Sequence, residues 1–186
     1  MSPSSTPPAD VVESYVRLWN ERDYEVVPDL VAESFVLEDP AIAEDVGPGS
    51  SGETRGRSGL ESFMRRVGRG FPDFRFAVND LVASDDLVMD EVTFSGTHEG
   101  PFKGVPPTGR AIEMDMMAMF RVEDWRVQRH SVCFDQREFL DQLGLTVPEV
   151  FGQLPKLAYR KSDRGGERSG TGTDLQVPRR GGARAQ

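Results

Sequence analysis

Hydrophobic residues in the first part of the chain recur at helical spacing. Within about residues 8–21 they lie three or four positions apart, at Val12, Tyr15, Val16 and Trp19. This spacing predicts a helix with one apolar face. A second, short helix is expected over about 25–33. A third is expected to follow a capping box formed by Ser58 and Glu61 and to end near residues 68–70.

Beyond residue 72 the spacing of hydrophobic residues changes to two, which is typical of β-strands. Four long strands are expected there, over about 74–83, 87–97, 111–122 and 126–134, with a bulge at Asn79 and Asp80 and a short helical turn after the last. One short strand, 35–37, precedes them and is followed by a loop over 41–56. Helices followed by strands predict an α+β fold, in which the sheet buries one face against the helices.

Composition and charge limit the possible partners. The chain has 186 residues, and no apolar run is long enough to span a membrane. Residues 1–155 carry 28 acidic and 14 basic side chains, whereas residues 156–186 carry three acidic and eight basic ones. A domain this acidic repels phosphate backbones. We therefore expect a cytoplasmic protein with no nucleic-acid partner and no membrane partner, and the few lysines suggest a halophilic source.

The chain is expected to contain one folded domain, over residues 9–150. Residues 1–8 are expected to be a flexible N-terminus, and 151–186 a disordered tail rich in glycine and arginine. The single cysteine, Cys133, lies in an apolar segment and is expected to pack as a small hydrophobic residue.

Five segments together resemble one known family. They are 11–20 (VVESYVRLWN), 36–40 (VLEDP), 94–98 (FSGTH), 104–110 (GVPPTGR) and 120–124 (FRVED). From about residue 9 to 145 the chain resembles the SnoaL-like polyketide cyclase and ester cyclase family of the nuclear transport factor 2-like superfamily. The resemblance implies a cone-shaped α+β barrel, in which three N-terminal helices pack on a curved, mainly antiparallel sheet around an apolar pocket. It also implies a homodimer through the outer sheet face.

The resemblance implies catalytic roles for two residues. The first helix and the segment 38–40 also resemble the steroid isomerase branch, where the aspartate matching Asp39 moves a proton on carbon. The tyrosine matching Tyr15 donates a hydrogen bond to the developing oxyanion. Burial suits these roles, because desolvation raises the pKa of a carboxyl group toward neutrality. The alternatives are a turn at Asp39, before Pro40, and ordinary helix packing for Tyr15.

The two histidines, His98 and His130, are further catalytic candidates, because a histidine can transfer protons near neutral pH. Their alternative role is structural, as hydrogen-bonded side chains. No ligand spacing supports a metal site, and no phosphate-binding loop or activated nucleophile is evident. We therefore expect neither a metal nor a cofactor.

Strand alternation places the expected ligand-binding residues on one face of the sheet. Together with two helix residues they are Trp19, Phe63, Asp90, Phe94, Met114, Met116, Ala118, Phe120, Val132 and Phe134. Their alternative role is ordinary core. Many relatives have an aspartate where this chain has Ala118, and only His130, Asp90 or Asp115 could replace that acid. By alternation, Asp115 faces the other side.

These features predict a cofactor-free enzyme that uses acid–base chemistry on a small apolar carbonyl compound or ester, such as a polyketide-like molecule. Cyclisation, isomerisation and hydrolysis are the expected reactions, with Asp39, Tyr15 and His130 at the centre. The alternative is a non-catalytic protein of the same fold that binds a small hydrophobic ligand or serves as a dimerisation module.

Overall fold

Helices and strands form separate layers in this protein. The structure, a computed structural model, describes residues 8–42 and 52–145. Its elements are α1 (Pro8–Glu21), a 3₁₀ helix (Tyr24–Val26), α2 (Val27–Leu30), β1 (Val31–Asp39), β2 (Gly52–Arg55), α3 (Gly56–Gly70), β3 (Arg75–Ser84), β4 (Leu87–Thr97), β5 (Ala111–Glu123), β6 (Arg126–Phe134) and α4 (Gln136–Gln142). The predictions for the N-terminus before residue 8 and for the tail after residue 145 fall outside the described residues.

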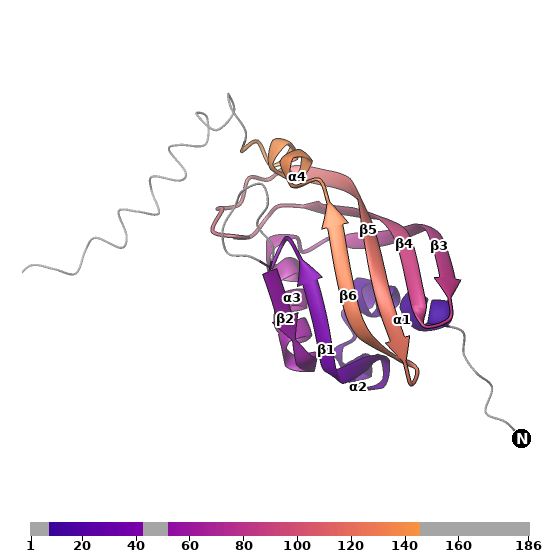
Figure 1. The fold of residues 1–186 in the computed structure, drawn as a ribbon. Helices are drawn as coiled ribbons and strands as arrows, with labels where there is room; N and C mark the ends of the chain where they lie inside the picture. Colours follow the sequence, from indigo (N-terminus) through magenta and orange to yellow (C-terminus); the bar gives the residue numbers. More distant parts are fainter. Residues whose placement is uncertain (1–7, 43–51, 146–186) are drawn as a thin grey trace, which may run out of the picture.

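The strands form one six-stranded sheet in the order β2-β1-β6-β5-β4-β3 (Figure 1). The pairs β1/β2, β3/β4, β4/β5 and β5/β6 are antiparallel, and β1 runs parallel to β6. The α+β fold and the mainly antiparallel sheet are therefore confirmed. The expected bulge is also present, because the register of β3 against β4 shifts between Val78 and Asp80.

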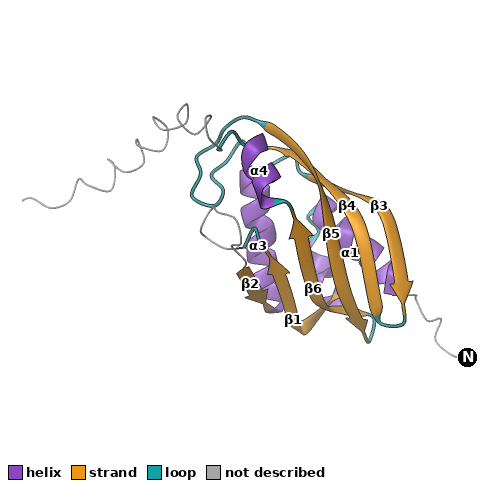
Figure 2. Cartoon of the chain, turned by 45° about the horizontal axis from the view of Figure 1, so that its top comes forward, coloured by secondary structure: helices purple, strands orange, loops and turns teal. Residues whose placement is uncertain are grey.

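Helices α1 and α3 cover one face of the curved sheet, and α4 lies at the end of the sheet where β6 ends (Figure 2). Alternation along β5 is complete, because every second residue from Ile112 to Val122 is buried. The buried face of α1 includes Tyr15 and Trp19, and that of α3 includes Phe63. Within the described part of the chain, no helix is long and apolar enough to cross a membrane.

The second helix was the least accurate of the predicted elements. It ends at Leu30 rather than at residue 33, because Val31 is already extended and pairs with Val127 of β6. The first strand is consequently longer than the predicted 35–37. Within the expected loop 41–56, residues Gly52–Arg55 form β2, which is one of the two edge strands of the sheet.

Two local predictions were wrong. Helix α3 begins at Gly56, so Ser58 lies inside its first turn and does not act as the N-cap. Cys133 is exposed. The alternation of side chains along β6 explains this exposure. His130 faces inward, so Cys133, three positions further along the strand, faces outward.

Candidate active site

An apolar cavity of about 80 Å³ lies between the helices and the inner face of the sheet. Its lining residues come from α1, α3, α4 and five of the strands, and from the loops that join them. The side chains that bring a nitrogen or oxygen atom to this wall are Tyr15, Trp19, Asp39, Asp90 and His130. The rest of the wall is hydrocarbon and methionine sulfur, so charge inside the cavity is poorly solvated.

Asp39 is the last residue of β1 and lines the cavity with 8% of its surface exposed. Its Oδ1 accepts a 2.6 Å hydrogen bond from the backbone N–H of Ala41, so the turn role is present as well. Burial raises the pKa of Asp39 to about 6, although this hydrogen bond and the nearby Lys103 and Arg66 lower it. The desolvation of the carboxylate outweighs these stabilising contacts.

Tyr15 and His130 contact one another inside the cavity. The Tyr15 hydroxyl lies 3.2 Å from His130 Nδ1, and the ring of His130 stacks on Phe120 at 4.3 Å between centroids. Burial lowers the pKa of His130 to about 3, so the imidazole is neutral. Burial also raises the pKa of Tyr15, and the charge of Asp39 adds to this effect. Tyr15 therefore stays protonated, in the field of the Asp39 carboxyl.

Two proton arrangements satisfy this contact. Either the tyrosine O–H donates to His130 Nδ1, or a protonated Nδ1 donates to the tyrosine oxygen. In the second arrangement the Tyr15 O–H is free to donate to a ligand. The indole N–H of Trp19 also approaches Tyr15 and lowers its pKa, but it has no partner at hydrogen-bond geometry among the described residues.

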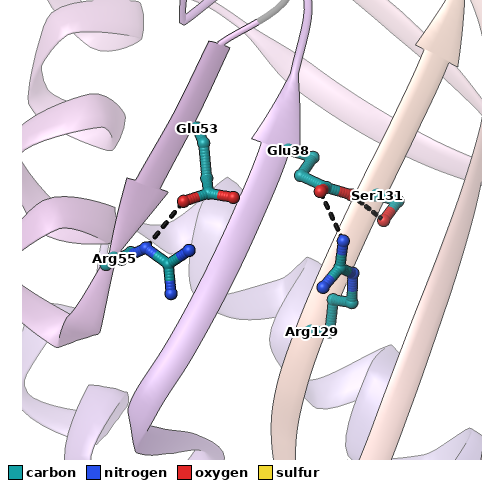
Figure 3. Close-up of polar contacts among 5 residues, drawn as sticks. All are labelled: Glu38, Glu53, Arg55, Arg129 and Ser131. Atoms are coloured by element: carbon teal, nitrogen blue, oxygen red, sulfur yellow. Dashed lines mark hydrogen bonds and ion pairs between the residues drawn. The ribbon is translucent and has the colours of Figure 1, made fainter.

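Polar contacts on the outer face hold β1 against β6, next to Asp39 and His130 (Figure 3). Glu38 accepts hydrogen bonds from Arg129 and, at 2.9 Å, from the Ser131 hydroxyl. Arg129 and Ser131 flank His130 in the chain, and Glu38 precedes Asp39. Because neighbouring strand residues face opposite ways, these outer contacts fix the register in which Asp39 and His130 face the cavity. On β2, Arg55 pairs with Glu53 at 2.6 Å.

Asp90 of β4 lines the same cavity and is 2% exposed. Neither of its carboxyl oxygens has a hydrogen-bond partner among the described residues. Burial raises the pKa of Asp90 to about 6. The backbone N–H of Ala118 lowers it slightly without reaching hydrogen-bond geometry.

His98 lies apart from this wall. It is fully buried, its ring stacks on Phe71 at 5.1 Å, and its Nδ1 lies 3.1 Å from the Thr108 hydroxyl. Burial lowers its pKa. His98 does not line the cavity, so its surroundings fit the structural alternative better than a catalytic role.

The other predicted site residues all line the cavity, as do several that the sequence did not indicate. Among the latter are Phe71 after α3, Phe102 in the loop between β4 and β5, and Phe139 of α4. These three come from loops or a short helix, where no periodicity marks the inward face. In the described part of the chain, no group of three or more His, Cys, Asp or Glu side chains is placed to hold a metal ion.

Comparisons with known proteins agree with this fold. A family model for SnoaL-like polyketide cyclase matches residues 9–143. Wild-type IdmH, a candidate polyketide cyclase from Streptomyces antibioticus, is 35% identical, with 75% of this chain and 99% of that chain covered and a TM-score of 0.63. TsrD from Streptomyces laurentii is 25% identical, with 74% and 95% covered and a TM-score of 0.62. No curated protein sequence matches the chain.

Proposed function

The chain belongs to the SnoaL-like polyketide cyclase family, and on that basis we propose that it is a cofactor-free acid–base enzyme acting on a small apolar carbonyl compound or ester. The observation that carries the proposal is Asp39, a carboxyl group in an apolar cavity with its pKa raised to about 6. A general base works best when its pKa lies near the working pH. The step assigned to Asp39 is removal of a proton from the carbon next to a carbonyl group, which can begin a cyclisation or an isomerisation.

Tyr15 stabilises the negative charge that develops on the carbonyl oxygen during this step. His130 donates from Nδ1 to the tyrosine oxygen, which lies 3.2 Å away, and the Tyr15 O–H then donates to the substrate oxygen. A donor held in place before the reaction is effective because it needs no rearrangement as charge develops. His130 is therefore a positioning residue. Because its ring is neutral, this role requires the tautomer that carries the proton on Nδ1.

The wall of the cavity selects the substrate. An engineered cavity of about 150 Å³ binds benzene, and the present volume of about 80 Å³ is smaller than that example. Met114 and Met116 line the wall and can adjust their conformation at low cost. An apolar, ring-containing ketone or ester of the polyketide type suits such a wall, whereas a charged substrate would lose its solvation there.

Hydrogen–deuterium exchange on acetophenone tests the proposal without knowledge of the natural substrate. Acetophenone is a small aryl ketone, and its methyl protons lie next to the carbonyl group. In D₂O near pH 6.5 we expect the protein to accelerate loss of the methyl signal in the proton NMR spectrum. Asp39→Asn should reduce the enzymatic rate by about 100-fold or more, the effect typical of losing a general base.

Asp115→Asn is the matched control, because Asp115 faces outward on β5, between the inward-facing Met114 and Met116. Its exchange rate should equal that of the wild type. Exchange that survives Asp39→Asn would remove Asp39 from the proposed role. If acetophenone and larger polyketide-like ketones raise the melting temperature but no exchange occurs, the non-catalytic binding protein becomes the better description.

A further inference from the structure

Asp90 has a buried carboxyl group that the fold itself does not explain. It is 2% exposed, and neither oxygen has a hydrogen-bond partner within the described residues. An unpaired buried polar group destabilises a fold. Such a group in a native fold needs an explanation, and a catalytic role is one of the recognised ones.

The sheet register leaves this carboxyl group open to the cavity. Asp90 pairs with Ala118 of β5, which in turn pairs with Val132 of β6. All three line the cavity, and the side chain of Ala118 is a methyl group that offers Asp90 no hydrogen-bond donor. Along β4 the inward neighbours of Asp90 are Val88 and Val92. The surroundings are therefore apolar on both sides.

The apolar surroundings also determine which form of Asp90 meets a ligand. Among the described residues, the other titratable groups that line the cavity are Tyr15, Asp39 and His130, and no lysine or arginine lines it. Without an adjacent cation, burial favours the neutral acid, which agrees with the raised pKa of Asp90. A neutral carboxylic acid donates a hydrogen bond, so its natural partner is an oxygen acceptor such as a carbonyl group.

We propose that Asp90 is a catalytic acid of this site, whose carboxylic O–H donates to the carbonyl oxygen of the substrate while Asp39 removes the proton from the adjacent carbon. The inference rests on the proposed function. In this step the C–H proton passes to Asp39 and the Asp90 proton passes to the oxygen, which gives a neutral enol. Asp39 ends protonated and Asp90 ends ionised, so the two residues together carry one negative charge before and after the step.

The pH profile of acetophenone exchange tests this division of roles. The active form needs Asp39 ionised and Asp90 protonated, and burial raises the pKa of each to about 6. The rate should therefore be highest near pH 6 and fall on both sides. Asp90→Asn should remove the alkaline fall and lower the maximum at least tenfold, whereas Asp115→Asn should leave the profile unchanged. A wild-type profile in Asp90→Asn would overturn the proposal.

A binding measurement separates this inference from the proposed function. The carbonyl stretch of acetophenone labelled with ¹³C at the carbonyl carbon shifts to lower frequency when an acid donates to its oxygen. In the Asp39→Asn background, which has no base, we expect a larger shift at pH 5, where Asp90 and Tyr15 both donate, than at pH 8, where Asp90 is ionised and Tyr15 alone donates. Asp90→Leu, added to that background, should remove this pH dependence and leave only the smaller shift that Tyr15 causes at both pH values.

The outcomes are distinct. A pH-dependent shift without any exchange in the wild type would contradict the base role of Asp39 and retain the ligand contact of Asp90. Exchange in the wild type with an identical shift in Asp90→Leu would contradict the Asp90 inference alone. Circular dichroism of each variant checks that the fold is intact.

Discussion

Neighbouring carboxyl groups on the two faces of the sheet have opposite properties. Glu38 faces outward, where hydrogen bonds from Ser131 and Arg129 lower its pKa. Asp39, the next residue, faces the cavity, where burial raises its pKa to about 6. One step along β1 therefore separates a solvated structural ion from a candidate base. The medium on each side of the sheet, rather than the type of residue, determines the chemistry.

The same contrast occurs on β4. Asp90 is buried without a hydrogen-bond partner among the described residues, and Glu91 beside it is exposed. The inner face thus collects carboxyl groups that are costly to ionise, and the outer face carries ordinary surface charge. Buried carboxyl groups of this kind reduce the stability of the folded protein, and they provide groups that can exchange protons with a substrate. The four predictions below test how separate the two faces are.

The largest difference is expected between two neighbours on β5. Phe120 is 1% exposed and packs on His130 and Tyr15, whereas Met119 is 38% exposed on the outer face. Phe120→Ala should lower the free energy of unfolding by about 3–5 kcal/mol, because it leaves a cavity in the core. Met119→Ala should change it by about 0.5 kcal/mol or less. Urea unfolding of both variants gives these values.

Protein concentration sharpens this test. If Met119→Ala lowers the free energy of unfolding only at high protein concentration, the outer face is an interface between two copies, as the expected homodimer requires. Equal losses for the two variants at every concentration would contradict the division of the sheet into a packed face and a free face.

A smaller effect, of unusual sign, is expected for Asp39→Asn. The folded-state pKa of about 6 lies above the ordinary value of 3.8, so the folded state binds the proton more tightly than the unfolded chain. The contribution of this proton to stability is complete below pH 3.8 and is lost as the pH rises through 6. Asp39→Asn should therefore be more stable than the wild type at pH 8, by about 3 kcal/mol, and show no such gain at pH 3.5.

Glu38→Gln provides the opposite case on the outer face. The folded-state pKa of Glu38 lies below 4.5, so its contribution is present above pH 4.5 and is lost as the pH falls. The variant should be slightly less stable at pH 8, by less than about 1 kcal/mol, because the pair is exposed. Melting temperatures of the wild type and both variants at pH 8 and pH 3.5 test these two expectations.

A loss of stability at pH 8 in Asp39→Asn would show that the Asp39 carboxylate is better solvated than its burial indicates.

Alternation made much of the inner face predictable from sequence. It placed Met114, Met116, Ala118 and Phe120 together and turned Asp115 outward, as the burial of β5 confirms. The same rule, applied to Cys133, would have corrected its predicted burial. The parallel pairing of β1 with β6 could not be predicted, because it joins segments about 90 residues apart and leaves no local pattern. The lack of a hydrogen-bond partner for Asp90 among the described residues could not be predicted either, because it depends on which residues of the neighbouring strands lie beside it.

The smallest effect concerns Ser131, whose hydroxyl donates to Glu38 at 2.9 Å. Ser131→Ala removes this hydrogen bond, and the pKa of Glu38 should rise toward its ordinary value while Arg129 retains part of the shift. The cost in stability should be about 0.5 kcal/mol, because both groups are accessible to water.

Carbon NMR titration of the side-chain carboxyl groups can follow Glu38 and Asp39 in one experiment. The pKa of Asp39 should stay near 6, since its cause is burial in the cavity rather than a contact on the outer face. If both pKa values move together, the outer contacts tune the cavity directly, and the two faces are not separate.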